Sequence, residues 1–251
     1  MSRLSTLSKG LRFVFANPFT TLRWAARCFD DGARREAARL ADNSEWEERV
    51  APYRITFERF LERYHLESSV PVRLVNSAPQ PQSVRDFELF ILGTLCRCLE
   101  AKRVMEIGTY RGRTTYNLAA NVASGGRVFT LNYLDPESRE KFVVGEIYRG
   151  TPLESMIDTI SGDSMRFDFS HWYGSIDLMF IDGNHSLPYV RSDSAQAFRC
   201  VRPGGIIAWH DIGPNHPEAT AAALGICEAE RVSPSLVDGT QLLLVVRPGH
   251  V

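Results

Sequence analysis

The chain has 251 residues, of which 24% are charged, and its formal net charge is −1. This length allows one elaborated domain or one domain with an appendage, and the near-zero charge excludes a global field that would hold nucleic acid. We therefore expect no nucleic-acid partner. The five cysteines lack the spacing of a zinc site, and their odd number fits reduced thiols, so we expect a cytoplasmic protein.

The first charged residues of the chain are all basic. The five charges between Arg3 and Arg27 are positive, large apolar side chains lie between them, and the first acid is Asp30. Charges recur too often for a signal peptide or a membrane span. Two alternatives stay open for residues 3–29. One is a helical cap that packs on the catalytic domain or on a second subunit of a homo-oligomer. The other is an amphipathic segment that makes peripheral contact with the inner face of a membrane.

Strand and helix patterns alternate along most of the remaining chain. Helices are predicted over residues 53–64, 84–100, 113–123 and 187–200, and strands over 103–107, 127–132, 156–161, 176–181 and 205–209. Two last strands, 229–237 and 241–246, form a hairpin with Asp238-Gly239 at its turn. This order predicts an α/β fold, with a Rossmann-like, mostly parallel sheet covered by helices on both faces, a C-terminal antiparallel hairpin, and N-terminal helices before it.

A glycine-containing turn follows the strand predicted over residues 103–107. Glu106 stands two residues before Gly108, and Gly112 follows four residues later. A plain strand-to-helix turn would explain this spacing equally well. The acid, however, would repel a dinucleotide diphosphate, which such loops hold at a helix N-terminus, whereas it suits the cationic methionine end of S-adenosylmethionine (SAM).

The segment Glu106–Gly112 resembles the cofactor loop of class I SAM-dependent methyltransferases. Three further segments follow in the order of that family, namely Ser161–Ser164, Ile176–His185 and Arg202–Asp211. The pattern is most similar to the branch of macrocin-type sugar O-methyltransferases and cephalosporin-hydroxylase-like proteins. The resemblance covers residues from about Val84 to Val246 and implies a SAM-binding methyltransferase domain over residues 83–251. It says nothing about the first fifty residues, where the helical patterns predict an N-terminal helical extension over residues 1–76.

The resemblance also implies which residues contact SAM. Residues at the methionine and ribose end would be Glu106, Gly108, Tyr110, Gly112 and Thr114, and Asp163 and Ser164 would lie at the adenine. Asp182 is a further candidate for the cofactor site, where it would bind the SAM ammonium group as an alternative to a metal. The family usually has an acid that binds both ribose hydroxyls at the end of the second strand. This chain has Asn132 there, which can accept one hydrogen bond and donate another but lacks the strength of a charge.

The ends of two neighbouring strands carry the residues expected to act on the acceptor. Asp182 ends one strand and His210-Asp211 ends the next. Two carboxylates favour Mg²⁺, and the imidazole also allows another divalent cation. His210 is then a metal ligand, a general base, or a residue that contacts the metal ligands without binding the metal. His185 has the pKa range of a general base. Ordinary helix capping and loop hydrogen bonds are the alternative roles for these side chains.

Three functions fit these patterns. The first is SAM-dependent O-methylation of a small acceptor such as a sugar or a glycolipid, assisted by a divalent metal. The second is a non-catalytic SAM-binding or scaffold protein of the same fold, which Asn132 would permit. The third is a nicotinamide-dependent oxidoreductase, which Glu106 and the terminal hairpin disfavour.

Overall fold

A computed structural model describes residues 43–76, 84–133 and 142–249 of the chain. The segment 3–29 therefore lies outside the described residues. The strands are β1 (Arg54–Ile55), β2 (Arg103–Ile107), β3 (Arg127–Asn132), β4 (Ile157–Ser161), β5 (Ile176–Ile181), β6 (Val201–Trp209), β7 (Ser235–Val237) and β8 (Leu243–Val246). The α-helices are α3 (Asn43–Val50), α4 (Phe57–Arg63), α5 (Asp86–Cys98), α6 (Arg113–Ala119), α7 (Leu187–Cys200) and α8 (Pro217–Ala229).

All these strands form one sheet in the order β1-β7-β8-β6-β5-β2-β3-β4. The central strands pair in parallel, with Ile107 beside both Leu131 and Ile181. Strand β8 runs antiparallel to β6 and to β7, which confirms the predicted C-terminal hairpin. Because parallel strands end at the same edge, the ends of β2, β3, β5 and β6 share one edge of the sheet.

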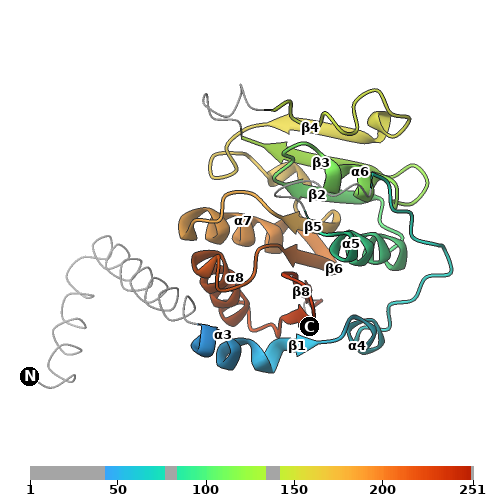
Figure 1. The fold of residues 1–251 in the computed structure, drawn as a ribbon. Helices are drawn as coiled ribbons and strands as arrows, with labels where there is room; N and C mark the ends of the chain where they lie inside the picture. The colour runs from blue at the N-terminus through green and yellow to red at the C-terminus, as the bar shows by residue number, and fades with distance from the viewer. Residues whose placement is uncertain (1–42, 77–83, 134–141, 250–251) are drawn as a thin grey trace, which may run out of the picture.

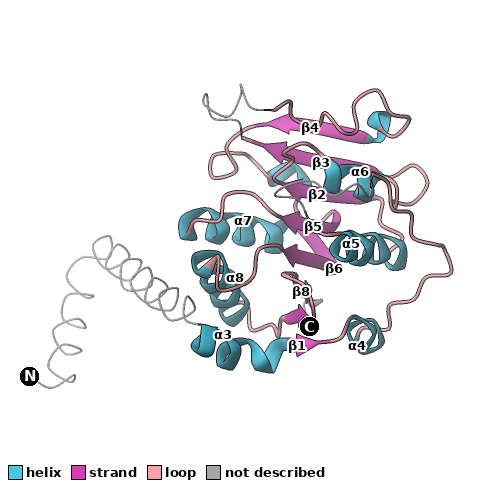
Figure 2. Ribbon diagram, in the orientation of Figure 1, coloured by secondary structure: helices cyan, strands magenta, loops and turns pink. Residues whose placement is uncertain are grey.

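The helices cover both faces of the sheet (Figures 1 and 2). Strand β5 explains why, since Met179 and Ile181 point into the core beneath α3, α7 and α8, while Leu178 and Phe180 point into the core beneath α4, α5 and α6. A strand that is buried on both sides is apolar at nearly every position, as β5 is. The predicted Rossmann-like architecture is therefore confirmed.

The structure corrects several predicted elements. Residues 54–55 are not helical but form β1, which pairs in parallel with β7, because the Thr56 hydroxyl caps α4 by accepting a hydrogen bond from the backbone N–H of Arg59. The predicted strand 229–237 is wrong over its first half. There α8, which begins with Pro217 and contains five alanines, ends at Ala229, and residues 230–234 form a turn and a loop before β7. Helix α6 ends at Ala119, earlier than predicted.

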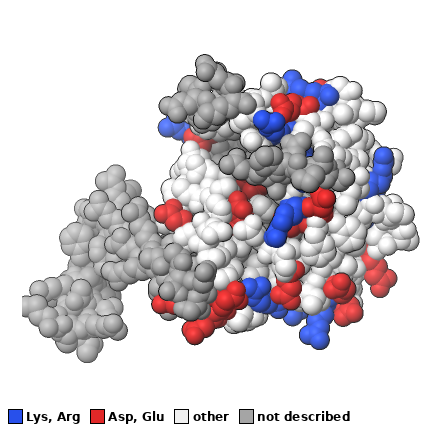
Figure 3. Space-filling model, in the orientation of Figure 1, with Lys and Arg blue, Asp and Glu red and all other residues white. Residues whose placement is uncertain are grey.

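The surface of the described residues mixes both signs of charge. Figure 3 shows acidic and basic side chains interspersed over the visible face, in agreement with a net charge of −1.

Within the described ranges, no helix combines the length and apolar character needed to cross a bilayer.

Candidate active site

The turn between β2 and α6 requires glycine at two positions. Gly108 has φ +107°, and a Cβ there would lie 2.0 Å from the backbone oxygen of Asp182. Gly112 has φ +87°, and a Cβ there would lie 2.4 Å from the ring of Tyr148. No other residue type fits either position without displacing its neighbours. The two glycines therefore let the turn pack against the end of β5 and the Tyr148 ring while its backbone borders a cavity.

Glu106 lies beneath this turn and is fully buried. Its carboxylate accepts hydrogen bonds from the hydroxyls of Thr115 and Thr130, the latter at 2.6 Å, while its other oxygen has no hydrogen-bond partner among the described residues. Burial raises the pKa of Glu106 to about 8 in spite of these bonds. The predicted contact between Glu106 and SAM stays a prediction, because the side chain sits under the cavity wall.

Asn132 ends β3 and holds the turn in place. Its Oδ1 accepts a hydrogen bond of 3.0 Å from the backbone N–H of Tyr110, a residue with φ +48°. This bond leaves the NH₂ of Asn132 as the group available to a ligand.

A cavity of about 980 Å³ opens at this edge of the sheet. Its volume lies at the upper end of the roughly 300–1,000 Å³ that small-molecule sites occupy, so it has room for a cofactor and an acceptor. Ten of the predicted site residues line it, namely Gly108, Tyr110, Gly112, Thr114, Asn132, Ser164, Asp182, His185, His210 and Asp211. Glu106 and Asp163 are not among the lining residues, and Asp163 instead accepts a hydrogen bond from the backbone N–H of Met165.

Aromatic and basic side chains that were not predicted as site residues complete the wall of the cavity. They are Tyr133, Phe142, Tyr189, Arg113 and His216, together with the amide of Gln241. The Phe142 ring meets the Tyr110 ring edge-on, with their centroids 4.6 Å apart. Of these residues, only His216 could be expected near the site, because it follows the strand that ends in His210-Asp211. The sequence did not indicate the others, because most of them lie in loops whose path the strand pattern does not determine.

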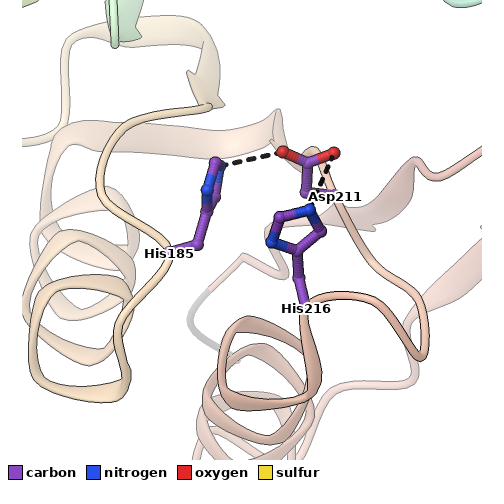
Figure 4. Close-up of side chains that lie close together, drawn as sticks. All are labelled: His185, Asp211 and His216. Carbon is purple, nitrogen blue, oxygen red and sulfur yellow. Dashed lines mark ion pairs between the residues drawn. The ribbon is translucent and has the colours of Figure 1, made fainter. Parts of the chain in front are cut away.

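The predicted acid and histidine residues converge at the ends of β5 and β6. His185 Nε2 lies 2.9 Å from Asp211 Oδ2 and 3.7 Å from Asp182 Oδ1, and His210 Nδ1 lies 3.3 Å from an oxygen of each aspartate. Figure 4 shows His185 and His216 both facing Asp211, with His216 Nε2 3.9 Å from Asp211 Oδ1 and the two imidazole rings 4.7 Å apart between their centroids. The structure thus brings together the four residues predicted for catalysis and metal binding.

These close contacts shift the pKa values of the cluster. Burial would raise the pKa of Asp211, but the adjacent imidazoles of His185 and His210 hold it well below its usual range. The nearby carboxylates of Asp182 and Asp211 raise the pKa of His185 to about 9. Burial lowers the pKa of His210, but its carboxylate partners outweigh burial and raise it well above the usual range.

Glu88 is a member of this cluster that sequence reasoning missed. It lies in the first turn of α5, it is buried, and its Oε2 is 3.2 Å from His210 Nε2. Burial would raise the pKa of Glu88, but its hydrogen bonds to His210 and Arg85 lower it to about 2. A signal was available, since Leu92 and Leu95 follow Glu88 at helical spacing and place it on the buried face of the helix.

The donor atoms fit a divalent cation. One ligand atom each from Asp182, His210 and Asp211 lie within 4.8 Å of one another, and His185, Asp211 and His216 form a second such group. His210 Nδ1 and His185 Nε2 are buried, and neither has a well-aligned hydrogen-bond partner within the described part of the chain. Nitrogen atoms that lie close to carboxylates without such alignment are suited to share a metal with them.

The fold and the site together define an α/β enzyme with its ligand cavity at the carboxyl ends of parallel strands. The family model described as a methyltransferase domain matches residues 105–212, which include the turn after β2 and the ends of β5 and β6. A protein of Mycobacterium sp. (strain JLS), provisionally named an O-methyltransferase, is 32% identical over 174 residues, covering 62% of this chain and 76% of that protein.

Solved structures share the fold. An O-methyltransferase of Klebsiella pneumoniae, also provisionally named, has a TM-score of 0.56 at 18% identity, over 85% of this chain and 99% of that one. TomG of Streptomyces achromogenes, an O-methyltransferase of tomaymycin synthesis solved with SAM, has a TM-score of 0.56 at 17% identity, over 78% of this chain and 100% of its own. The present chain belongs to the class I SAM-dependent methyltransferases, in the family of the O-methyltransferases, which confirms the predicted class.

Proposed function

We propose that this enzyme transfers the methyl group of SAM to a hydroxyl of a small acceptor, a sugar or another compound rich in hydroxyl groups. The observation that carries the proposal is the cavity, which is lined by the glycine turn, by Asn132, and by the cluster of Asp182, His185, His210 and Asp211. Donor and acceptor can therefore meet in one cavity, as methyl transfer requires. The aromatic rings of Tyr133, Phe142 and Tyr189 offer flat surfaces to an acceptor ring.

In this proposal the residues of the turn bind the donor. The NH₂ of Asn132 donates to the ribose, and the glycine positions let the cofactor lie against the backbone. SAM supplies an electrophilic methyl group on a sulfonium. Binding orients that methyl group toward the acceptor, and orientation contributes much of the rate.

His185 accepts the hydroxyl proton in this proposal. The acceptor oxygen forms a bond to the methyl carbon as the bond from that carbon to sulfur breaks, and the proton passes to the imidazole. Asp211, 2.9 Å from His185, stabilises the imidazolium that results. Asp182, Asp211 and His210 would hold a divalent cation, which would stabilise the negative charge that develops on the acceptor oxygen.

Ligand-induced shifts in thermal unfolding test the donor. We expect SAM and S-adenosylhomocysteine to raise the unfolding temperature, and NAD to leave it unchanged. Stabilisation by NAD alone would contradict the proposal. SAM binding without turnover on any hydroxylated acceptor would instead favour the non-catalytic SAM-binding protein.

Turnover with labelled SAM tests the acceptor site. Asp182→Ala and Asp211→Ala should each lower the rate at least 100-fold, because each removes a charge from the cluster. The matched control is Asp158→Ala, which removes a surface carboxylate that pairs with Arg127 far from the cavity. If both cluster variants turn over at the rate of the control, the metal mechanism is wrong.

A further inference from the structure

Glu88 has no role in the function proposed above, yet it contacts His210, the least exposed member of the histidine and aspartate cluster. We propose that Glu88 positions His210 so that Nδ1 of its imidazole becomes a metal ligand, and that the site therefore prefers a transition-metal ion such as Co²⁺ over Mg²⁺. This inference rests on the metal-assisted form of the proposed function. It adds Glu88 as a positioning residue and transition-metal ions as the preferred class of metal.

The Glu88 carboxylate is fixed in place. The side chain is 1% exposed. Its Oε2 accepts a hydrogen bond of 2.9 Å from the backbone N–H of Arg85, and its Oε1 accepts one of 2.8 Å from the backbone N–H of Gln241. These bonds tie the start of α5 to the segment between β7 and β8. A carboxylate that accepts hydrogen bonds from two backbone groups has little freedom to move, and it can therefore fix the orientation of a side chain that donates to it.

His210 is oriented by that carboxylate. Its Nε2 lies 3.2 Å from Glu88 Oε2, so Nδ1 is the ring nitrogen that faces Asp182 and Asp211. A carboxylate that accepts the Nε2 proton leaves the lone pair on Nδ1, and metal-binding histidines in proteins are commonly oriented in this way. The ring is 9% exposed, so it has little room to rotate away.

The distances fit three ligands around one ion. Bonds of about 2.1 Å from a metal to nitrogen or oxygen place neighbouring ligand atoms about 3.0–3.4 Å apart. Nδ1 of His210 lies 3.3 Å from Asp182 Oδ1 and 3.3 Å from Asp211 Oδ1. Nδ1 is also buried without an aligned hydrogen bond within the described residues, so two carboxylates surround a nitrogen that they do not satisfy.

The donor set determines the class of metal. Two carboxylates alone would suit Mg²⁺, which prefers oxygen ligands and retains water. An imidazole nitrogen adds affinity for Co²⁺, Ni²⁺ or Zn²⁺, which follow the general order of transition-metal affinities. The competing arrangement is a permanently protonated His210, which would itself remain as the cation between the carboxylates and leave no place for an ion.

Titration calorimetry of the full-length, chelator-treated protein with Co²⁺ and with Mg²⁺ tests the proposal. We expect wild type to bind Co²⁺ at least tenfold more tightly than Mg²⁺. Glu88→Gln should weaken Co²⁺ binding by about 10- to 100-fold, the usual effect of removing such a partner, and change Mg²⁺ binding much less. The matched control is Arg85→Met, which removes a mostly exposed guanidinium from the same carboxylate and leaves His210 untouched. It should keep the wild-type preference.

Failure to bind Co²⁺, equal affinity for both ions, or an unchanged preference in Glu88→Gln would overturn the proposal. Should Glu88→Gln not fold, pulsed EPR of Mn²⁺-loaded wild type decides instead, because it detects a coordinated imidazole nitrogen. That signal should disappear in His210→Asn, and its absence from wild type would contradict the assignment. None of these measurements needs turnover. SAM binding in the same preparations therefore reports separately on the proposed function.

Discussion

The side chain of Asn132 and the backbone N–H of Tyr110 form a hydrogen bond of 3.0 Å that joins the end of β3 to the turn after β2. Tyr110 has φ +48°, a conformation that a residue other than glycine adopts at some cost, so this bond helps to hold a strained turn. Asn132 therefore has a structural role in addition to any contact with the cofactor. An aspartate could keep the same bond with one oxygen and offer the other to a ribose.

We expect Asn132→Asp to bind SAM more tightly than wild type, by about fivefold. The charged oxygen that replaces the NH₂ would accept a hydrogen bond from a ribose hydroxyl, and such a charged bond is stronger by about 1 kcal/mol than the neutral bond that the NH₂ donates. Asn132→Ala should bind SAM more weakly, because the N–H of Tyr110 loses its acceptor. Calorimetric titration with SAM measures both. Weaker binding by Asn132→Asp would show that the NH₂ group, and not its oxygen, is what this site needs.

Gly108 and Gly125 provide a matched pair of substitutions. Both have positive φ, but a Cβ at Gly108 would lie 2.0 Å from a backbone oxygen, whereas a Cβ at Gly125 would meet no described atom within 4 Å. Gly125→Ala should cost about 1–2 kcal/mol of stability from backbone strain and leave SAM affinity unchanged. Gly108→Ala should also abolish SAM binding, because the turn must move. Equal SAM affinity in the two folded variants would mean that the turn is not the cofactor loop.

The strand order and the two covered faces follow from patterns that the sequence contains. Strand β5 is apolar at nearly every position, and Gly108 and Gly112 mark a turn that only glycine can make. Asp182, His210 and Asp211 meet as predicted, because neighbouring parallel strands end at one edge. Glu88 could not be assigned in the same way, since its partner His210 is 122 positions away in the chain and the contact depends on how α5 packs.

The raised pKa of His185 gives the reaction a definite pH dependence. A general base must be unprotonated, and the contacts with Asp182 and Asp211 raise the pKa of His185 to about 9. In chelator-treated protein, where no cation binds Asp182 and Asp211, the rate of a single turnover should therefore increase with pH from 6 to 9 and level off above. Asp211→Asn should shift this rise to lower pH, because one of the carboxylates that hold the proton is gone. A rate that is flat between pH 6 and 9 would exclude His185 as the base.

The same shift makes stability depend on pH in the opposite direction. His185 has a higher pKa in the folded chain than its ordinary value of 6.5, so its contribution is complete below pH 6.5 and is lost as the pH rises through about 9. Urea unfolding of wild type and His185→Asn should show a difference in stability that shrinks between pH 6.5 and 10. A difference that grows over this range would mean that His185 is uncharged in the folded protein.

Ser194 contacts the residue that precedes His210, and its substitution tests whether the stability of the fold can change without a change in turnover. Its hydroxyl accepts a hydrogen bond of 2.8 Å from the indole Nε1 of Trp209, the residue before His210, and both side chains are buried. Ser194→Ala leaves that N–H unpaired and should cost about 1–3 kcal/mol, which lowers the unfolding temperature by about 2–4 °C for each kcal/mol. Exposed Ser155→Ala is the control and should change neither stability nor turnover.

Because Ser194 contacts Trp209 and not the acid and histidine cluster, turnover by the folded Ser194→Ala variant should stay within about twofold of wild type. A large loss of turnover at full stability would place Ser194 among the residues that position His210.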